Sequence, residues 1–572
     1  MKKNKEVIID KDKIYSADFE TTTKEPAVIW LWGLLRLSDN CREKVIYGEK
    51  GINEFIKTIF SLDKGENIKI YFHNLKYDGS YILNWLLNNK YKQVKAFSKF
   101  KNKTFEAIID SIGTIYCITI NQNYRQIKFM CSYRISQSSI ENLAKTFNMS
   151  VEKENINYNR HNKKCKVTKK EIHYLQNDIL VMSTFLNKLY DFFKTTKLTV
   201  GSYALNEFNK TNKDYKSYFP NLPYKVDTYL RKAYRGGICY VNPSHQNKLI
   251  TCKNGAVYDY NSMYPSMLHS LSNNYYPVGK PILFGSEEFK TILKKEKLFV
   301  INCFCRYEIK KNHLPCISSR KSLFNKIKWE TKSDGLTELY LTNIDYEMLF
   351  ENYKVKDFEV ISGYYFDKKE KGLIDDYINK WYEKKKTETG SDKIFAKYML
   401  NSLTGKFGQK LDLVGKIPYL EDNVIHWKIE TETSKGLYLP LVMFNTAYSR
   451  QTLTKAINKN YKNFIYCDTD SIHLIDDTNT KLKVGKNLCE WKKENNILKC
   501  KYIRQKCYID KIENKKYNIK IAGLPDEAKI YKDDDTIFDE YYIGRVFKNA
   551  KLIPKQVKGG AILVNADFTI KE

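Results

Sequence analysis

Four acidic residues in the first third of the chain have the types and spacing of a metal-dependent site. Asp18 and Glu20 stand two apart in an apolar run, 14–20, that predicts a β-strand, so both carboxylates leave the same face. Asp78 follows a second predicted strand at 68–72. Neighbouring carboxylates repel one another unless a cation lies between them. A D-x-E pair by itself is equally typical of a solvated surface.

A predicted helix supplies the remaining members of this group. Thr168 and Glu171 form a capping box that marks the start of the helix. Tyr174 and Asp178 lie four residues apart on the helix and therefore share one face. Four carboxylates with an assisting tyrosine can hold two divalent metal ions and a water molecule for in-line attack on a phosphodiester. The alternative interpretation is that Tyr174 and Asp178 are simply exposed to solvent on the surface of the helix.

A second acidic group is split between two places further along the chain. Asp259 lies in a predicted strand that runs into a turn at Pro265. Asp468 and Asp470 lie between two apolar half-strands. An unpaired charge between apolar runs is costly to bury, and a metal cation removes that cost. This context favours a second metal site, whereas D-x-D alone indicates little.

Basic residues lie between the two parts of this acidic group. Lys393, Lys397 and Asn401 follow one another in steps of four, on one face of a helix predicted from about 373 to 403 and ended by Gly405. Cations on that face could hold the phosphates of a nucleotide while metal ions hold them from the other side. A solvated lysine face is the alternative.

The composition bounds the class of protein that must position these residues. The chain has 572 residues, which suggests about three or four domain-sized units. Hydrophobic residues make up 42%, which excludes a largely disordered chain. Lys and Arg number 97 against 66 Asp and Glu, so the net charge of +31 favours a polyanion, nucleic acid first, as partner. A compositional surplus of surface lysines is the alternative.

Other classes of site are disfavoured. The thirteen cysteines contain no C-x-x-C pair, which argues against structural zinc and favours reduced thiols in a cytosolic compartment. The chain lacks a P-loop, a signal-peptide pattern and any run of roughly 20 apolar residues, so we expect neither secretion nor a membrane span. The shorter apolar runs 28–35 and 437–444 predict buried strands.

Together these motifs resemble those of family B DNA polymerases of the protein-primed type found in small tailed bacteriophages. The resemblance covers essentially the whole chain and follows the order of the family's motifs. The matching segments are Asp18-x-Glu20, Asn74-x-x-Tyr77-Asp78, Tyr174-x-x-x-Asp178, Tyr234-x-Gly236-Gly237, Asp259 to Tyr264, Lys397-x-x-x-Asn401, Asp468-x-Asp470 and Lys506-x-Tyr508. One departure is Thr404, which stands where the family usually has a tyrosine.

The resemblance implies a multidomain fold of the α/β and α+β classes. An RNase H-like 3′–5′ exonuclease domain would occupy 1–197, and a right-hand polymerase domain would occupy 198–572. Its parts would be the palm (about 198–270 and 435–520), a first insertion (about 271–372), the fingers (about 373–411), a second insertion (about 412–434) and the thumb (about 521–572).

The resemblance also implies a role for each site residue. Two Mg²⁺ ions per site, with Mn²⁺ as a possible substitute, would be held by Asp18, Glu20, Asp78 and Asp178 in the exonuclease and by Asp259, Asp468 and Asp470 in the palm. Tyr174 would orient water, and Asn74, Tyr77 and Ser132 would hold a frayed primer end. Lys153, matched through the spacing Lys153-x-x-x-x-Tyr158, would steady the scissile phosphate. The nucleotide would contact Tyr264, Lys385, Lys393, Lys397 and Asn401. The template would contact Tyr234, Gly236 and Gly237, and the primer would contact Lys506 and Tyr508.

The implied activity is DNA-directed DNA synthesis with proofreading and strand displacement, started on a protein hydroxyl. Its partners would be primer-template DNA, dNTPs and a terminal protein bound by the first insertion, with the enzyme a monomer in the cytoplasm of an infected host cell. Two alternatives remain: a nuclease whose C-terminal part only binds DNA, and a non-catalytic nucleic-acid-binding protein.

Overall fold

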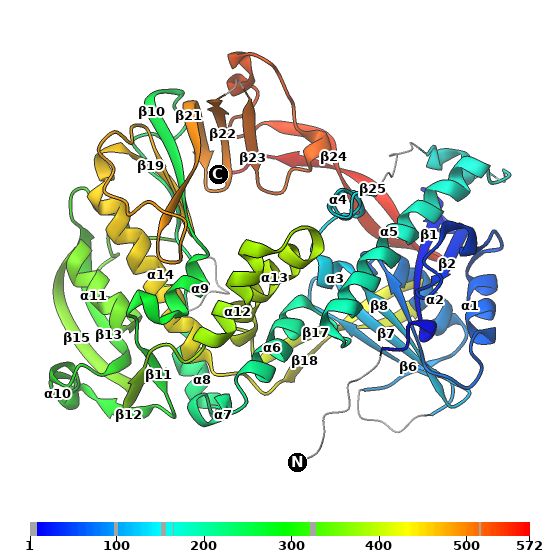
Figure 1. Cartoon of the computed structure of the whole chain (residues 1–572), viewed down its shortest axis with the longest axis horizontal. Coiled ribbons are helices and arrows are strands. Elements are labelled where there is room, and N and C mark those ends of the chain that lie inside the picture. The colour runs from blue at the N-terminus through cyan, green and yellow to red at the C-terminus, as the bar shows by residue number, and fades with distance from the viewer. Residues whose placement is uncertain (1–8, 96–100, 150–155, 164, 321–327, 514–515) are drawn as a thin grey trace.

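A computed structural model describes residues 9–95, 101–149, 156–163, 165–320, 328–513 and 516–572. Figure 1 shows an N-terminal α/β body on the right, a second body built on another sheet on the left, and helices between them. In the described part of the chain no helix is both long enough and apolar enough to cross a bilayer.

The N-terminal body is a mixed sheet of eight strands with helices on both faces. Its strands, in spatial order, are β3 (Ile46–Gly48), β2 (Ile29–Arg36), β1 (Ile14–Thr21), β4 (Ile68–Phe72), β8 (Arg125–Cys131), β7 (Ile115–Gln122), β6 (Thr104–Ile109) and β5 (Lys92–Gln93). Its helices are α1 (Gly51–Ser61), α2 (Asp78–Asn88), α3 (Tyr133–Ser136), α4 (Ile140–Thr146) and α5 (Lys169–Phe193). The strands predicted at 14–20, 28–35 and 68–72 are confirmed.

Helix α5 begins at the predicted capping box and packs closely on the sheet. Thr168 accepts a hydrogen bond from the backbone N–H of Glu171, whose side chain accepts one from the N–H of Thr168. Gly33 of β2 permits the close packing, because a Cβ there would lie 2.5 Å from Cδ1 of Ile179 and 2.9 Å from Cδ2 of Leu175. Gly33 pairs with Asp18 across β1 and β2, so α5 is drawn against the carboxylate face of β1.

A seven-stranded antiparallel sheet forms the core of the second body. Its strands, in spatial order, are β23 (Tyr517–Ile521), β22 (Cys507–Ile512), β21 (Trp491–Arg504), β10 (Ile250–Tyr260), β20 (Ser471–Leu474), β19 (Phe464–Asp468) and β9 (Cys239–Val241). The two half-strands predicted around Asp468 and Asp470 are confirmed as β19 and β20.

Several local predictions are wrong, including the helix end at Gly405. The run 437–444 is not a strand, because helix α14 (Leu439–Lys459) begins within it. The first residues of α14 are buried on every side, so they show no alternation of apolar and polar residues at helical spacing. Pro265 lies within helix α9 (Met263–Leu268) rather than in a loop. It belongs to the first four residues of that helix, whose backbone N–H groups have no partner inside the helix, so proline costs no hydrogen bond there. The helix predicted at 373–403 is two helices.

These two helices are α12 (Asp375–Thr387) and α13 (Gly390–Phe407). The backbone becomes extended at Glu388 and Thr389, and Gly390 takes a φ of +54°. Gly405 lies inside α13, and Gly408 is the residue that ends it. Helix α6 (Val200–Thr211) packs against both α12 and α13, whereas α8 (Tyr224–Arg231) packs against α14. The short helix α7 (Tyr215–Tyr218) lies between α6 and α8 in the chain.

The strands of the two segments predicted to be insertions lie outside the two large sheets. The segment 271–372 contains a four-stranded sheet of β12 (Ile282–Gly285), β15 (Tyr353–Phe366), β13 (Leu298–Ile309) and β14 (Thr337–Thr342), with helices α10 (Phe289–Lys294) and α11 (Asn343–Asn352). It also contributes β11 (Tyr276–Val278) and β16 (Lys368–Glu370). The second segment is one hairpin, β17 (Asp412–Glu421) and β18 (Val424–Thr433).

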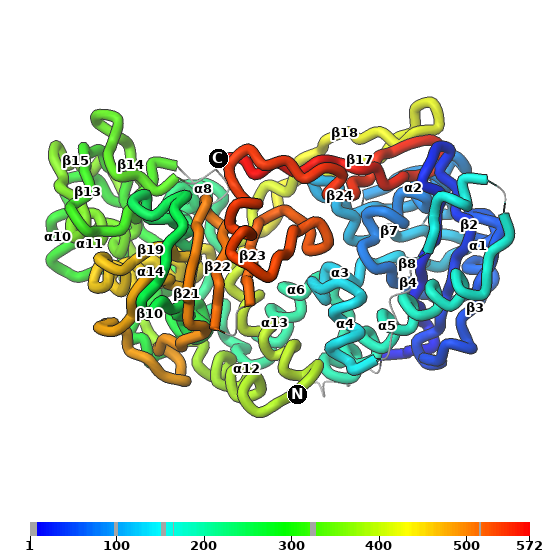
Figure 2. Tube along the Cα trace, turned by 90° about the horizontal axis from the view of Figure 1, so that it is seen from above, coloured from blue at the N-terminus to red at the C-terminus, as the bar shows by residue number. Residues whose placement is uncertain are grey.

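Two hairpins from the second body reach the N-terminal body, as the view from above shows (Figure 2). The β17–β18 hairpin accepts a hydrogen bond at its tip, from Asn84 Nδ2 to the carbonyl of Asn423 over 3.1 Å. The other hairpin is β24 (Val546–Val557) and β25 (Gly560–Thr569). The hydroxyl of Tyr81 donates to its Ala561 carbonyl over 2.6 Å. Both hairpins therefore fix the N-terminal body against the rest of the chain.

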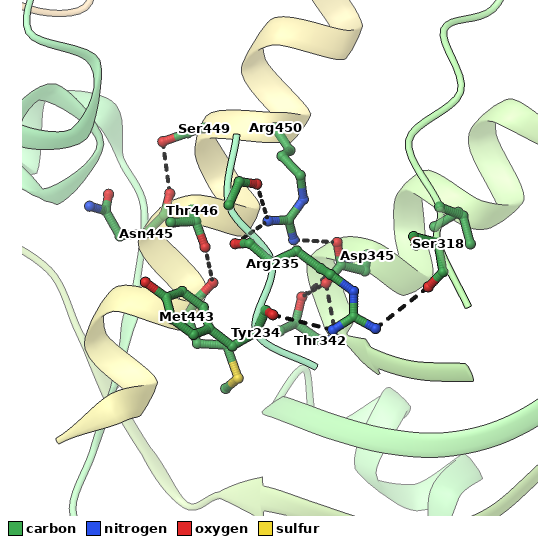
Figure 3. A network of polar contacts seen from close by, with 12 residues as sticks. Tyr234, Arg235, Ser318, Thr342, Asp345, Met443, Asn445, Thr446, Ser449 and Arg450 are labelled. Carbon is green, nitrogen blue, oxygen red and sulfur yellow. Dashed lines mark hydrogen bonds and ion pairs between the residues drawn. The ribbon is translucent and has the colours of Figure 1, made fainter. Parts of the chain in front are cut away.

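A buried ion pair joins three further segments (Figure 3). Arg450 of α14 is 1% exposed, and its guanidinium lies 2.7 Å from Oδ1 of Asp345 at the start of α11. The same guanidinium donates to the carbonyls of Arg235 and Gly236, over 2.9 and 3.1 Å. One side chain thus holds the insertion, helix α14 and the segment that follows Tyr234.

We expect Arg450→Met to lower the free energy of unfolding by about 3–5 kcal/mol, because it leaves Asp345 as an uncompensated buried charge. The double variant Arg450→Met with Asp345→Asn should recover part of that loss. Denaturant unfolding measures both, with Gln451→Met on the same helix as a control expected to change stability by less than about 0.5 kcal/mol. Equal losses in the single and double variants would contradict a charge-based role.

Candidate active sites: two carboxylate clusters

The first cluster gathers carboxylates from three elements of the N-terminal body. Asp18 and Glu20 come from β1, Asp78 is the first residue of α2, and Asp178 comes from the middle of α5. Glu20 and Asp78 are each only 4% exposed. The structure therefore brings together the four acidic residues of the first predicted site.

Burial and mutual repulsion make these carboxylates hard to ionise. Burial, followed by the charges of Asp78, Glu20 and Asp178, raises the pKa of Asp18 well above its ordinary value. The pKa of Glu20 is also raised well above its ordinary value, mainly by burial and then by Asp178. Burial raises the pKa of Asp78 to about 7 and that of Asp178 to about 6. Full ionisation of this cluster would therefore require positive charge from outside these four residues.

Two tyrosines border this cluster. Tyr174 hydrogen-bonds to Asp178, as the helical spacing predicted that it could. Tyr158 hydrogen-bonds to both Glu20 and Tyr174, and sequence reasoning missed it as a site residue. The spacing Lys153-x-x-x-x-Tyr158 in the sequence was the signal that could have identified Tyr158. Lys153 itself lies outside the described residues.

The residues expected to hold a DNA end differ in accessibility. Asn74 is exposed, and the half-buried Tyr77 hydrogen-bonds through its hydroxyl to Thr21 over 2.6 Å. Ser132 is fully buried, and its hydroxyl donates to the carbonyl of Phe72 over 3.2 Å. The expectation that Ser132 contacts DNA is not supported, because its hydroxyl is already used inside the sheet.

The second cluster lies on strands β10 and β19 of the seven-stranded sheet and on the turn that joins β19 to β20. Asp259 of β10 and Asp468 of β19 both lie opposite Ser471 of β20, one on each side. Asp470 follows Asp468 in a tight turn, in which Thr469 takes a φ of +60°. The carbonyl of Asp470 accepts a hydrogen bond from the N–H of Tyr260, over 2.8 Å. Backbone bonds therefore hold the turn beside Asp259.

Burial and neighbouring carboxylates also oppose ionisation at this cluster. Burial, followed by the carboxylates of Asp470 and Glu494, raises the pKa of Asp259 to about 7, although Lys385 and Lys492 oppose the shift. Burial also raises the pKa of Asp470. Asp468 differs, because Nζ of Lys506 lies 2.6 Å from its Oδ2.

Three predicted lysines lie near this cluster. Lys385 of α12 donates from Nζ to Oγ of Ser262 over 2.9 Å. Its pKa is lowered by burial, then by Lys397 and Lys393 of α13, while Asp259 acts in the opposite direction. Lys393, Lys397 and Asn401 are exposed on α13. The charge of Lys492 on β21 lowers the pKa of both Lys385 and Asp259. Sequence reasoning missed this residue, because nothing in the local sequence distinguishes it from other strand lysines.

The segment from Tyr234 to Gly237 lies between helix α13 and the acidic turn. A Cβ at Gly237 would lie 2.8 Å from the side chain of Thr469, whose N–H donates to the carbonyl of Ile238 over 2.7 Å. A Cβ at Gly408 would lie 2.5 Å from the hydroxyl of Tyr234. Both glycines are therefore needed for close approach.

The aromatic residues near the turn are partly buried. Burial and the nearby Tyr234 and Asp470 raise the pKa of Tyr264 to about 12. Tyr508 stacks on Tyr502, with ring centroids 5.0 Å apart. Thr404 is 8% exposed and lines a small cavity, and its hydroxyl makes no hydrogen bond within the described part of the chain.

The donor chemistry of both clusters suits a hard divalent cation. The ligands on offer are carboxylate oxygens, which Mg²⁺ and similar ions prefer. Among the described residues, no group of three His, Cys, Asp or Glu side chains is arranged so that it could hold a metal ion. Binding would therefore require these side chains to rearrange, and the raised carboxylate pKa values indicate that added positive charge would be favoured there.

We expect Asp78→Asn to stabilise the metal-free protein more at pH 8 than at pH 5. The folded protein keeps a proton on Asp78 up to about pH 7, whereas the unfolded chain loses it near pH 4, so stability falls as pH rises through this window. Asparagine removes that loss, and the gain at pH 8 should be roughly 2–4 kcal/mol. Thermal denaturation in a chelator measures it. The exposed Asp533→Asn is the control, and equal gains at both pH values would contradict the charge argument.

Comparisons with known proteins agree with this geometry. The family model for DNA polymerase type B, organellar and viral, matches residues 61–486. The chain is 34% identical to the DNA polymerase of Bacillus phage phi29 over 98% of this chain and 99% of that protein, and 30% identical to that of Streptococcus phage Cp-1 over 98% of each.

A solved complex of phi29 DNA polymerase with primer-template DNA superposes with a TM-score of 0.87, at 32% identity over 98% of this chain and 100% of that one. The ternary complex, which also contains incoming nucleotide, gives a TM-score of 0.85. Dependence on divalent metal is a property of the family. The nuclease and the non-catalytic alternatives are therefore set aside. This chain belongs to the organellar and viral type B DNA polymerases and is a DNA-directed DNA polymerase of the phage group.

Proposed function

We propose that the cluster of Asp259, Asp468 and Asp470 is the polymerising site. The observation that carries this proposal is that carboxylates from strands β10 and β19 and from the turn after β19 face lysines from α12 and α13. When bound, two Mg²⁺ ions, or Mn²⁺ in their place, would lower the pKa of the primer hydroxyl and neutralise the leaving pyrophosphate. Asp259 and Asp470 would hold them, with Asp468 assisting.

Residues around the cluster would position the substrates. Lys385, Lys393 and Lys397 would bind the triphosphate, because their charges converge on the side of Asp259. Asn401 lies one turn beyond Lys397 on the same face. Tyr264 would pack under the deoxyribose and exclude a 2′-hydroxyl. Because Thr404 is small and buried, this discrimination would depend mainly on Tyr264.

The strands of DNA would be held by two short segments. Lys506 and Tyr508 would contact the primer end, with Lys506 released from Asp468 when positive charge occupies the cluster. Tyr234, Gly236 and Gly237 would follow the template, because they lie between α13 and the acidic turn.

The first cluster would be a proofreading 3′–5′ exonuclease. Asp18, Glu20, Asp78 and Asp178 would hold two divalent ions, and Tyr174 would orient the attacking water through its bond to Asp178. Asn74 and Tyr77 would hold the frayed primer end, with the ring of Tyr77 available to stack on a base.

The layout would follow that of protein-primed phage polymerases. The exonuclease domain would be 1–197, and the polymerase domain 198–572 would comprise palm, fingers (about 373–411), thumb (about 521–572) and two insertions. The first insertion, about 271–372, would bind a terminal protein, and the hairpin at 412–434 would close around the downstream template for strand displacement. The enzyme would act as a monomer in the cytoplasm of an infected cell.

We expect substitutions in the two clusters to separate the two activities. Asp470→Asn should abolish primer extension with Mg²⁺ and dNTPs, and leave degradation of single strands intact. Asp18→Asn with Glu20→Gln should do the reverse. Gel assays of both activities on each variant measure this, with Asp533→Asn as a surface control. Loss of both activities in either folded variant would contradict two separate sites.

Protein priming predicts that the enzyme transfers the first nucleotide to a hydroxyl of a purified candidate terminal protein. Labelled nucleotide should become covalently attached to that protein when template ends are present, and the transfer should disappear in Asp470→Asn. Extension from DNA without any transfer to protein would limit the function to DNA-primed synthesis.

A further inference from the structure

A cysteine, a histidine and a glutamate form a hydrogen-bonded row beside the proposed exonuclease site. Sγ of Cys165 lies 3.2 Å from Nδ1 of His161, and Nε2 of His161 lies 2.8 Å from Oε1 of Glu171. With Nε2–H donated to the carboxylate, Nδ1 is left to accept the thiol hydrogen. In this arrangement an imidazole can take the proton of a nucleophile while an acid holds the imidazole in place.

The exposure of the three side chains suits such a role. His161 and Glu171 are 7% and 3% exposed, whereas Cys165 is exposed to solvent. All thirteen cysteines lie in the described part of the chain, where nine are buried and three are intermediate, so Cys165 is the one exposed thiol. Burial by itself would raise the pKa of Glu171, but hydrogen bonds from Thr168 and His161 outweigh it and bring that pKa below its ordinary value.

The imidazole is held in a single orientation. The ring of His161 stacks on Trp30, with centroids 3.7 Å apart and planes 3° from parallel. Arg160 lies 3.0 Å from Oε1 of Glu171 and fixes the carboxylate that holds the imidazole. A preoriented base and an ionised acid need little rearrangement when the thiol loses its proton.

The same segment of chain reaches the acidic cluster. His161 lies in a short 3₁₀ helix, Tyr158–Asn162, whose first residue hydrogen-bonds to Glu20 and Tyr174. Asn162, at the other end, accepts a hydrogen bond from the N–H of Thr23 over 3.0 Å. A change in the position of His161 is therefore transmitted within one turn to the side chain that contacts the carboxylates.

We propose that Cys165 is a covalent modification site for peroxides, with His161 as its base and Glu171 as the group that orients His161, and that its oxidation slows the exonuclease. The second half of this proposal rests on the function proposed above. If the S–O–H group kept the hydrogen bond to Nδ1 of His161, its oxygen would lie between Sγ and the ring, where the present separation of 3.2 Å leaves no room for it. Keeping that bond would therefore shift the 3₁₀ helix, and Tyr158 with it.

The chemical step balances with a peroxide as oxidant. The thiol proton passes to Nδ1 of His161, and the thiolate sulfur attacks one oxygen of hydrogen peroxide. An S–O bond forms, the O–O bond breaks, and the leaving hydroxide takes the proton from His161 to become water. The sulfur loses two electrons, the peroxide gains them, and the product is a sulfenic acid.

The reactivity of Cys165 is tested on the full-length protein with iodoacetamide, and with hydrogen peroxide followed by dimedone, both read by peptide mass spectrometry. We expect Cys165 to react first, and its rate to fall roughly tenfold or more in His161→Gln and in Glu171→Gln, which retains the capping bonds. Cys41→Ser is the control and should leave the rate at Cys165 unchanged. A rate at Cys165 no faster than that of free glutathione, or unaffected by both variants, overturns the proposal.

The consequence is tested on the same samples by single-strand degradation and primer extension. Peroxide should slow degradation in the parent protein and spare extension, whereas Cys165→Ser should degrade single strands at the parent rate and resist peroxide. Equal inhibition of the parent and Cys165→Ser overturns the link between Cys165 and the exonuclease. Absence of degradation before any oxidation would overturn the exonuclease itself, while the labelling rates would still test the thiol.

Discussion

Mutual repulsion among partly buried carboxylates is the constraint on which both candidate sites depend. Asp18, Glu20, Asp78 and Asp178 meet where water cannot fully screen them, and burial raises the pKa of each. A fold that left these groups uncompensated would gain stability by moving them apart. The surrounding backbone prevents this, so these groups are compensated either by bound protons or by the positive charge of a divalent ion.

Close backbone packing is what holds the carboxylates together. Gly33 lets α5 approach the sheet closely enough for Asp178 to reach Asp18, and Gly237 lets the chain lie against Thr469 in the acidic turn. At each place a side chain would require a shift of the neighbouring element. The glycines therefore matter for the distance between elements rather than for a particular backbone angle.

Contacts between distant segments then fix the two sites relative to each other. The β17–β18 and β24–β25 hairpins bond to the N-terminal body through Asn84 and Tyr81. Arg450 ties the insertion to the segment after Tyr234. Because buried side chains donate these bonds to backbone carbonyls, the arrangement of the two bodies is specified by hydrogen bonding as well as by apolar packing.

Local patterns in the sequence were sufficient for the strands that carry Asp18 and Asp468, for the capping box at Thr168 and for the residue types of both clusters, because spacing of two or four residues fixes a shared face. They were insufficient for 437–444, where an apolar run surrounded by core has no periodicity, and for the break at Glu388 and Thr389. Tyr158, Lys492 and Arg450 acquire their roles through contacts with residues remote in the chain. Which carboxylates meet, and which groups border them, was decided by tertiary packing, because Coulomb and hydrogen-bond energies depend on distances that no local pattern encodes.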